Sequence, residues 1–286
     1  PVAELARRPC LGHRASVVKS EKRAPCAGEP PHQDRVPRPD AGRGQERRGG
    51  PGTALSAFRW AARLNFHEGV ANHFSLAVNN DGTRFIMNPN QRYFSRIKAS
   101  DIIELDANDP SSLIGPDAPD VTAWGLHGGI HRHCPHARCV MHVHSNYATV
   151  LASLADSNLP PIDQNAAMFY NRYVIDDNYG GLALEEEGNR CAQLLADPKH
   201  KVMIMGNHGI LVIGSTIAET FNRLYYFERA AGNYIQALQT GRPLRLLSDE
   251  VAEKTAQQLE AYPEQDERHF SELKSILDHE GSDYAD

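Results

Sequence analysis

The stretch Val140-Met141-His142-Val143-His144-Ser145 combines an apolar strand pattern with two histidines. Side chains two residues apart in a β-strand point to the same face. A strand over residues 138–144 would therefore hold the imidazoles of His142 and His144 side by side, near the point where a loop follows. Neighbouring imidazoles commonly supply two ligands to one metal ion. The stretch predicts a buried strand and part of a metal site.

A second strand-like run, residues 202–205, ends at Gly206-Asn207-His208-Gly209. We interpret the glycines as residues that let the backbone turn and hold His208 where strand ends meet. Three neutral imidazoles with open coordination positions are typical of a catalytic metal site. The alternative reading, histidines without a metal, remains open, because an H-x-H pair alone is a weak signal.

A third group of histidines lies in the helix expected over residues 123–133. His127 and His131 have the i, i+4 spacing of a zinc site, but the Glu that follows the first histidine in metalloprotease motifs is absent. We interpret His131, His133 and His136 as surface residues.

Outward from these motifs, the chain alternates helices and strands. The sequence predicts helices over 54–66, 123–133, 147–154, 185–195 and 217–238, strands over 74–78, 84–87, 138–144, 201–205 and 210–213, and a helical turn followed by a strand over 99–105. The turn Asn79-Asn80-Asp81-Gly82 joins two of these strands into a hairpin. Hairpin connections favour an antiparallel or mixed sheet over a Rossmann fold.

Composition limits the class of protein. The 286 residues carry a net charge of -6, which makes nucleic acid an unexpected partner, and no apolar run reaches the length of a membrane-spanning helix. Five cysteines without a C-x-x-C pair favour a reducing compartment. We therefore expect a cytoplasmic protein that does not contact membranes.

The two ends of the chain differ from the middle. Residues 1–53 hold 11 of the 30 basic residues but 6 of the 36 acidic ones, are rich in Pro, Gly and Arg, and show no periodicity, so we expect disorder. An Arg-rich targeting peptide is the alternative, although the prolines and acids oppose it. Because the chain starts at Pro1 and its first methionine is Met87, we expect that the true start is missing or misassigned and that residues 1–53 are not native. Residues 243–286 are predicted to form a charged, helical C-terminal tail.

The motifs together resemble one family. Trp124-x-x-His127-x-x-x-His131, Pro135-x-Ala137-x-x-Val140-x-His142-x-His144 and Asn207-His208-Gly209 occur in the order and spacing of the class II aldolase/adducin family, and the resemblance runs from about Ser56 to Leu238. It implies one α/β/α domain over residues 54–242, with a central, largely antiparallel (mixed) sheet flanked by helices. It also implies one divalent ion on His142, His144 and His208, with zinc expected and Fe(II) or manganese as alternatives, and a homotetramer with active sites between subunits.

The chain departs from the family's sugar-phosphate aldolases at three places. Their Ser-Ser-Glu segment, which supplies phosphate ligands and an acid/base Glu, corresponds here to Val121-Thr122-Ala123, and their Thr-Gly phosphate loop corresponds to Asn90-Gln91. Their tyrosine from the adjoining subunit corresponds to Gln164. The resemblance therefore implies a small substrate without phosphate.

Individual residues receive expected roles. The candidate proton carriers are His127, one turn along the helix from Ala123, and Tyr170 or Tyr173. The expected substrate contacts are Asn72, Ser75, Asn90, Gln91, Thr122 and Gln164, and Asn72 has a turn-capping role as its alternative.

Three functions follow from this pattern. The first is a metal-dependent lyase, decarboxylase or epimerase that acts on a hydroxy-carbonyl or hydroxy-acid substrate, whose enediolate the ion would stabilise. The second is a non-haem iron oxygenase, because three histidines without the Glu suit that chemistry and one branch of the family has it. The third is a non-catalytic scaffold like the head domain of adducin, although that branch lacks a working metal site.

Overall fold

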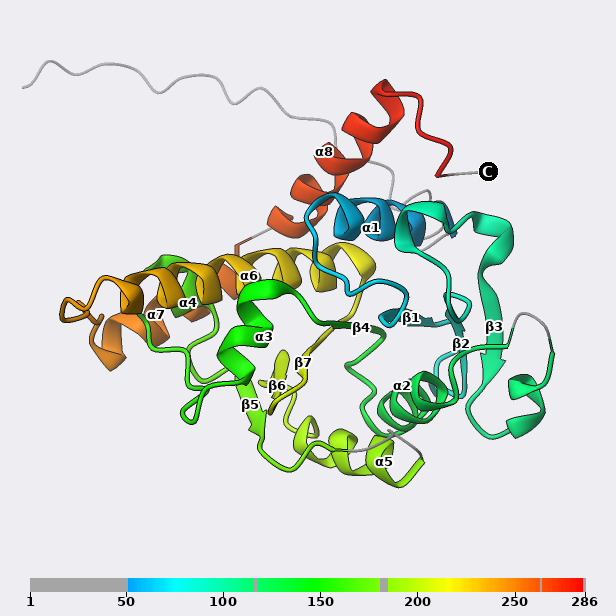
Figure 1. Cartoon of the computed structure of the whole chain (residues 1–286), viewed down its shortest axis with the longest axis horizontal. Helices are drawn as coiled ribbons and strands as arrows, with labels where there is room; N and C mark the ends of the chain where they lie inside the picture. The colour runs from blue at the N-terminus through cyan, green and yellow to red at the C-terminus, as the bar shows by residue number, and fades with distance from the viewer. Residues whose placement is uncertain (1–50, 116–117, 181–184, 263, 285–286) are drawn as a thin grey trace, which may run out of the picture. The chain divides into compact units, whose positions relative to one another are not determined.

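A seven-stranded sheet runs through the part of the chain that our computed structural model describes, residues 51–115, 118–180, 185–262 and 264–284 (Figure 1). Its strands are β1 (His73–Ala77), β2 (Arg84–Met87), β3 (Ile103–Asp106), β4 (Cys139–Val143), β5 (Tyr173–Asp176), β6 (Val202–Met205) and β7 (Gly209–Gly214). They lie in the order β3-β2-β1-β4-β7-β6-β5, and every pair is antiparallel except β5 and β6. The predicted mixed, largely antiparallel sheet is confirmed.

Helices cover both faces of this sheet (Figure 1). They are α1 (Pro51–Arg63), α2 (Val121–His133), α3 (Asn146–Ala152), α4 (Gln164–Met168), α5 (Glu185–Leu194), α6 (Ile217–Gln239), α7 (Asp249–Glu260) and α8 (Gln265–His279), with short 3-10 turns η1 (Phe94–Arg96), η2 (Ala99–Asp101) and η3 (Pro110–Leu113). Helices α1, α3, α6 and α8 pack on one face, and α2 and α5 pack on the other. The arrangement is the predicted α/β/α fold.

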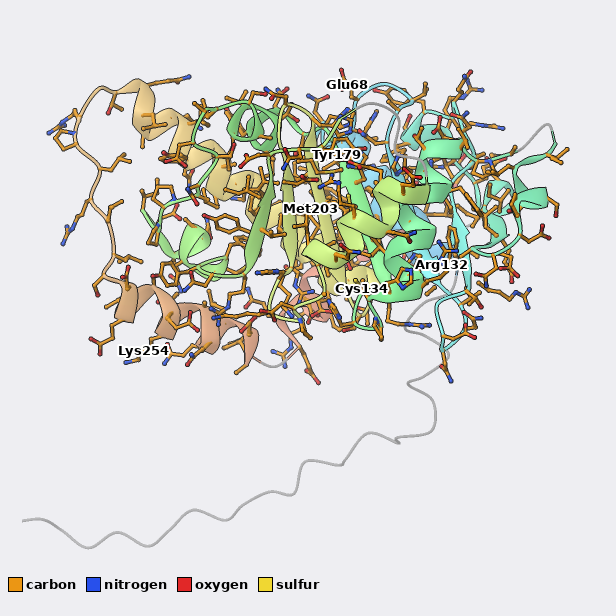
Figure 2. All side chains as sticks on the ribbon, turned by 90° about the horizontal axis from the view of Figure 1, so that it is seen from below. Glu68, Arg132, Cys134, Tyr179, Met203 and Lys254 are labelled. Carbon is orange, nitrogen blue, oxygen red and sulfur yellow. The ribbon has the colours of Figure 1, made fainter. Side chains whose placement is uncertain are left out.

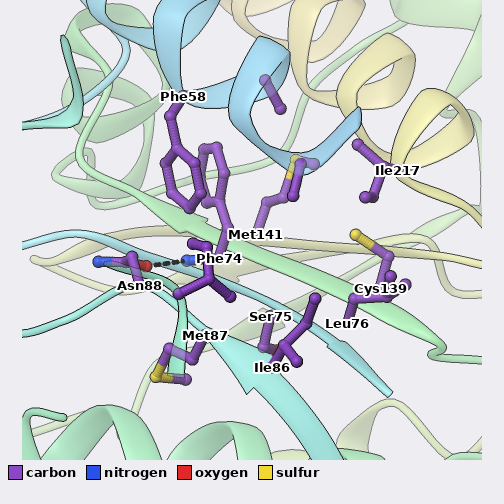
Figure 3. A pocket seen from close by; sticks show the side chains of 13 residues that line it. Phe58, Phe74, Ser75, Leu76, Ile86, Met87, Asn88, Cys139, Met141 and Ile217 are labelled. Atoms are coloured by element: carbon purple, nitrogen blue, oxygen red, sulfur yellow. Dashed lines mark hydrogen bonds between the residues drawn. The ribbon is translucent and has the colours of Figure 1, made fainter. Parts of the chain in front are cut away.

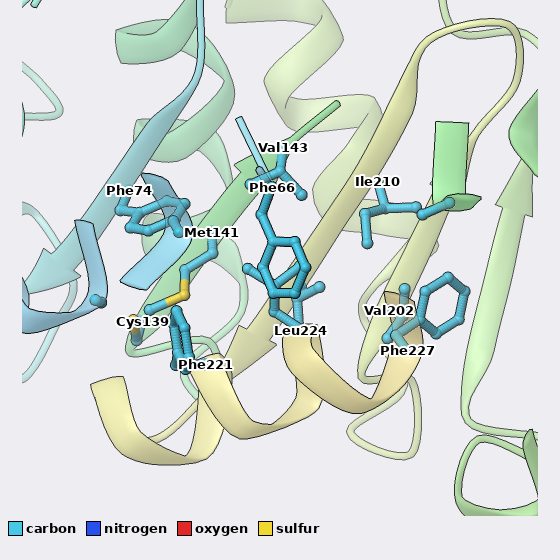
Figure 4. Packing of buried hydrophobic residues seen from close by; sticks show 14 of the residues in the cluster. Phe66, Phe74, Cys139, Met141, Val143, Val202, Ile210, Phe221, Leu224 and Phe227 are labelled. Atoms are coloured by element: carbon cyan, nitrogen blue, oxygen red, sulfur yellow. The ribbon is translucent and has the colours of Figure 1, made fainter. Parts of the chain in front are cut away.

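Strand alternation sorts the core into the two faces. Cys139 and Met141 of β4 belong to the cluster under α6, together with Phe221 (Figure 4). Val140 belongs to the cluster under α2 and α5. His142 has the same parity as Val140, so the period of two places its ring on the α2 face. The pattern that builds the core therefore also decides where the imidazole points.

A small apolar cavity remains under α1, lined by Phe58, Phe74, Met141 and neighbouring side chains (Figure 3). Its volume is about 20 Å³, which is close to the room that one water needs. The one hydrogen bond drawn there joins the backbone N–H of Phe74 to Oδ1 of Asn88, at 2.9 Å. The cavity is too small for a substrate, and we interpret it as a packing defect.

The predicted helices and strands are confirmed, with shifts of a few residues at their ends. One α-helix and one strand were not predicted, α4 and β5, and both lie between the expected helices at 147–154 and 185–195. Within the described ranges, no helix is both long and apolar enough to cross a membrane.

The structure describes the C-terminal segment of the chain but little of the N-terminal segment. Residues 1–50, and with them nearly all of the segment expected to be disordered, lie outside the described residues, and α1 already begins at Pro51. The C-terminal segment is helical, and α8 buries Phe270, Leu273 and Leu277 in the same core as α1 and α6.

Helices α2 and α5 touch through glycine. A Cβ atom on Gly188 of α5 would lie 2.1 Å from the carbonyl oxygen of Gly125 in α2, and one on Gly129 would lie 2.6 Å from the carbonyl carbon of Gly188. The two backbones are thus in contact, which only residues without a Cβ allow. This contact sets the distance of α2 from the helix beside it.

We expect Gly188→Ala to destabilise the protein by about 2–3 kcal/mol, because the new methyl group overlaps backbone that cannot move independently. Alanine is the better helix former by about 1 kcal/mol, so helix propensity predicts the opposite sign. Thermal and urea unfolding measure the change. The matched control is Gly180→Ala, where nothing lies within 4 Å of the new Cβ. A Gly188→Ala protein as stable as the control would contradict the close contact.

Candidate metal centre

Three histidine nitrogens converge at one end of the sheet. The Nε2 atoms of His142 and His144 are 3.0 Å apart, and each lies 3.1 Å from Nε2 of His208. The rings of His142 and His208 are stacked, and the ring of His144 stands nearly perpendicular to both. The structure therefore brings residues 142, 144 and 208 together, and their binding of a metal ion stays a prediction. This spacing suits three nitrogens bound to a single ion, since metal–nitrogen distances are about 2.0–2.1 Å.

Hydrogen bonds at the other ring nitrogens fix the tautomers. Nδ1 of His142 lies 3.0 Å from the carbonyl oxygen of Ile210, and Nδ1 of His144 lies 2.6 Å from a carboxylate oxygen of Glu68. Both oxygens only accept, so each Nδ1 carries the hydrogen and each neutral ring has a lone pair on Nε2. Two lone pairs facing one another cannot form a hydrogen bond. A cation satisfies both, and the donor set therefore fits a divalent ion.

Strand β4 carries two of these rings, and contacts between α3 and α6 hold the chain that follows them. His142 and His144 lie at the end of β4, and the chain then enters α3, whose first N–H groups at Tyr147 and Ala148 donate to the buried carboxylate of Glu228 on α6, at 2.8 and 2.9 Å. That carboxylate takes the place of a side-chain cap, which Ser145 does not supply. The loop after His144 is thereby fixed.

The turn between β6 and β7 presents the third histidine. Asn207 takes the positive φ of this turn, at 58°, so the bend depends on the asparagine and not on the flanking glycines as the sequence suggested. Gly209 serves another purpose, because a Cβ there would lie 2.5 Å from the carbonyl oxygen of Val143 and 2.8 Å from the ring of His144. Glycine thus lets His208 approach the strand that carries the other two imidazoles.

Burial keeps two of these imidazoles neutral. Desolvation, followed by the neighbouring histidine His73, lowers the pKa of His142 well below its usual value. Desolvation, followed by His144, lowers the pKa of His208 to about 4. The neutral form is the one that binds a metal ion, so both rings are ready to bind at neutral pH.

Glu68 is a residue that the sequence did not single out. Its side chain is 69% exposed and projects at the periphery (Figure 2). It nevertheless accepts the hydrogen of His144 Nδ1. Carboxylates in this position orient a ligating imidazole and raise its basicity. The signal for it, a lone acid just before Gly69, is too common to have been read from the sequence.

We expect Glu68→Gln to weaken divalent-ion binding about tenfold, at the low end of the 10–100-fold range because the pair is exposed. Calorimetric titration of the metal-free protein with Zn²⁺ measures the dissociation constant. The matched control is Glu104→Gln, an exposed acid that pairs with Arg84 and has no histidine partner in the described residues. Equal Zn²⁺ affinities for the two variants would show that Glu68 does not contribute to ion binding.

A cleft of about 240 Å³ opens beside the three imidazoles. Asn72, Asn90 and Thr122, predicted to contact substrate, line it; Asp120, His73 and Tyr179, which were not predicted, line it too. The ring of Tyr179 packs against that of His208 with centroids 4.6 Å apart. Among the described lining residues there is no lysine or arginine.

The other predicted residues lie elsewhere. Ser75 and His127 are buried behind the wall of the cleft, where the Ser75 hydroxyl contacts Nδ1 of His127. Tyr170 and Tyr173 line a separate pocket with Pro160 and Pro161. Gln91 and Gln164 are not among the described residues that line the cleft.

The expectation that His131 lies at the surface is wrong. Its ring is 2% exposed, its Nε2 lies 2.7 Å from Oγ of Ser75, and its Nδ1 lies 2.9 Å from the carbonyl oxygen of Ala137. His133 is exposed and His136 is half-buried. The i, i+4 spacing therefore reflects a ring aligned with His127 on the buried side of α2.

A second cluster with metal-ligand chemistry, Asp176, Glu187 and Cys191, has another explanation. Arg190 donates to both carboxylates, at 2.8 Å to Asp176 and 2.9 Å to Glu187. Burial, followed by nearby Asp176, raises the pKa of the Cys191 thiol to about 12, so the sulfur stays protonated. We interpret this cluster as an ion pair that joins α5 to β5.

Comparison with known proteins gives a consistent family. Residues 53–235 match the model of the class II aldolase and adducin N-terminal domain. The chain is 30% identical over 215 residues to the 4-hydroxy-3-prenylphenylpyruvate oxygenase/4-hydroxy-3-prenylbenzoate synthase of Streptomyces roseochromogenus subsp. oscitans, covering 71% of this chain and 73% of that protein. It is 29% identical to the decarboxylase NovR of Streptomyces niveus, covering 71% and 74%.

A solved structure is also similar. The aldolase II superfamily protein from Pseudomonas syringae superposes with a TM-score of 0.73 at 27% identity, covering 82% of this chain and 94% of that one. The family match over residues 53–235 includes all seven strands of the described sheet and the three converging histidines. The chain belongs to the class II aldolase and adducin family.

Proposed function

We propose that this protein is a divalent-metal-dependent enzyme that acts on a small, unphosphorylated hydroxy-carbonyl or hydroxy-acid substrate. The reaction type is carbon–carbon bond cleavage, decarboxylation or epimerisation. The observation that carries the proposal is the convergence of three Nε2 atoms, which lie within 3.1 Å of one another. The hydrogen bonds at Nδ1 of His142 and His144 leave a lone pair on Nε2 of each ring. A bound ion would supply Lewis-acid stabilisation of the negative charge that develops on a substrate oxygen.

Asn72 supports binding of a substrate oxygen at this place. Its Oδ1 accepts from the backbone N–H groups of Glu68 and His144, so the orientation of the amide is fixed. Its Nδ2 is buried, has no partner among the described residues, and belongs to the wall of the cleft. An unpaired buried donor costs about 1–3 kcal/mol, which a substrate acceptor would recover. We propose that Asn72 donates to a substrate oxygen.

The charges of the cleft support a substrate without phosphate. Asp120 places a carboxylate in the wall, and the hydrogen bonds that it accepts from Thr122 hold its pKa below the usual value even though burial acts in the opposite direction. No cation lines the described cleft to balance a phosphate dianion. Ala123 is 1% exposed and cannot carry a proton, so the acid/base group of the aldolases has no counterpart at this position.

We further propose a homotetramer, in which Tyr170 and Tyr173 would serve the cleft of a neighbouring subunit and Gln91 and Gln164 would complete substrate binding. His127 would act through His73, which separates it from the cleft. Size-exclusion chromatography with light scattering would measure the oligomeric state.

Metal analysis of the purified protein, followed by a turnover screen, tests the proposed function. We expect about one divalent ion per chain, with zinc first and manganese as the alternative, and turnover of unphosphorylated hydroxy-acids or aldehydes. Preference for a phosphorylated sugar would contradict our interpretation of Val121, Ala123 and Gln91. Absence of metal in a folded, metal-supplemented sample would favour a scaffold.

An iron oxygenase is the second candidate. It is favoured by the similarity to the Streptomyces oxygenase and by a ligand set of three histidines without a carboxylate. Bound iron together with oxygen consumption that depends on the substrate would select it over the lyase.

A further inference from the structure

A line of hydrogen-bonded side chains runs from the cleft into the interior of the α2 face. Nδ1 of His73 on β1 lies 2.7 Å from Nε2 of His127 on α2. Nδ1 of His127 contacts Oγ of Ser75, which lies 2.7 Å from Nε2 of His131. The line ends where Nδ1 of His131 meets the carbonyl oxygen of Ala137, at 2.9 Å. All four side chains are at least nine-tenths buried.

The carbonyl at the inner end decides the direction of every hydrogen bond. A carbonyl oxygen only accepts, so Nδ1 of His131 is the N–H and its Nε2 is an acceptor in the neutral ring. The Ser75 hydroxyl must then donate to His131 and can only accept from Nδ1 of His127. Nε2 of His127 becomes an acceptor, and Nδ1 of His73 donates to it.

The outer end of the line is therefore determined as well. With its hydrogen on Nδ1, neutral His73 has a lone pair on Nε2, and His73 is a wall residue of the cleft. His73 is only 8% exposed and its Nδ1 is bonded to another imidazole and not to a carboxylate, so its burial favours the neutral ring. Nε2 of His73 is a hydrogen-bond acceptor whose orientation the interior of the protein sets.

The neighbourhood of His73 strengthens this acceptor character. Asp120 carries a carboxylate in the same wall, and the hydroxyl of Thr122 donates to that carboxylate, so it is not a free donor toward the cleft. Asn72 is the one wall residue with an unpaired buried donor among the described residues, and it stands next to His144. The cleft thus has a donor beside the three imidazoles and acceptors at His73 and Asp120.

We propose that His73 binds substrate by accepting a hydrogen bond from a substrate hydroxyl group, and that Ser75, His127 and His131 are positioning residues that fix its tautomer. The substrate class is then a hydroxy-acid or hydroxy-carbonyl compound with a second, donating hydroxyl. This inference rests on the proposed function only in placing the substrate in this cleft.

Nitrogen-15 NMR of histidine-labelled protein tests the tautomers without any substrate. We expect His73, His127 and His131 each to be protonated at Nδ1 and unprotonated at Nε2. Ser75→Ala removes the hydroxyl that orders the line and should give mixed tautomers at His73, whereas Ser75→Thr keeps the hydroxyl and should restore the pattern. A hydrogen on Nε2 of His73 in the native protein would overturn the proposal.

Binding of three small acids to the Zn²⁺-loaded protein tests the ligand class. The three compounds are D-glycerate, lactate and 3-phosphoglycerate, and all have the same α-hydroxy-acid end. At the next carbon, glycerate carries a donating hydroxyl, lactate has none, and 3-phosphoglycerate carries a phosphate. We expect glycerate to bind roughly 2- to 12-fold more tightly than lactate, the worth of one hydrogen bond, and 3-phosphoglycerate to bind weakest. His73→Phe should abolish the difference between glycerate and lactate.

The outcomes separate this inference from the proposed function. If the tautomers are as expected and glycerate is preferred but no substrate turns over, the proposed function fails and the inference stands. If lactate binds as tightly as glycerate, if 3-phosphoglycerate binds best, or if glycerate does not bind, the role of His73 is wrong whatever the enzyme catalyses.

Discussion

His208→Ala should abolish stoichiometric binding of a divalent ion and lower kcat/KM by at least about 10³-fold. One of three nitrogens is lost, and the several kcal/mol of charge stabilisation that a catalytic ion provides are lost with it. His208 lies on the turn between β6 and β7 and its ring is half-buried, so truncation leaves the sheet intact. Inductively coupled plasma mass spectrometry measures the ion, and steady-state kinetics measure turnover.

The matched control is His133→Ala, an exposed histidine on α2. It should keep one ion per chain and the increase in Tm that we expect added metal to give the native protein. A His208→Ala protein that binds metal with unchanged affinity would show that the three rings are neighbours for some other reason.

Acid should destabilise the metal-free protein steeply, and His73, His127 and His131 alone should contribute up to about 4 kcal/mol per pH unit below pH 6.5. Burial lowers the pKa of His73 to about 3, that of His131 to about 4, and that of His127 well below its usual value. In the unfolded chain these rings bind protons near pH 6.5, whereas in the folded chain they do not. Below pH 6.5 the unfolded state therefore binds more protons, and the free energy of unfolding falls as pH falls.

Urea unfolding between pH 7.5 and 5 in the presence of a chelator measures this slope. Above pH 6.5 all three rings are neutral in both states and contribute no slope. His131→Asn removes one of the three and should reduce the slope by about 1.4 kcal/mol per pH unit, whereas His133→Asn, at an exposed position, should not. Stability that stays flat from pH 6.5 to 5 would mean that these histidines are already charged in the folded protein.

The strands and the convergence of three histidines could be predicted because their signals are local. Alternation in residues 138–144 sets the face of His142, and the turn residues 79–82 fix the hairpin. Helix α4 has only five residues, too few for a helical period, and β5 is not joined to a neighbour by a hairpin turn as β2 and β6 are. The parallel pairing of β5 with β6 depends on a crossover through α5 that no short pattern specifies.

The contacts around the three imidazoles could not be predicted, because the residues that make them are distant from one another in sequence. Ser75 meets His131 across 56 positions, and Glu68 meets His144 across 76. The i, i+4 spacing of His127 and His131 was visible, but it is the same for an exposed pair and for one that faces a sheet. Which face of α2 is buried follows from the glycine contact with α5, and that contact requires the fold.

The position of β4 between β1 and β7 has a consequence for folding kinetics. His142 pairs in register with His73 on one side and with Leu211 on the other, partners about 70 residues away in each direction. Such distant pairings form slowly, since loop closure precedes any gain from contact. The cation would meet its three nitrogens only after both pairings are complete, so its binding should lengthen the lifetime of the folded chain and leave the rate of its formation unchanged.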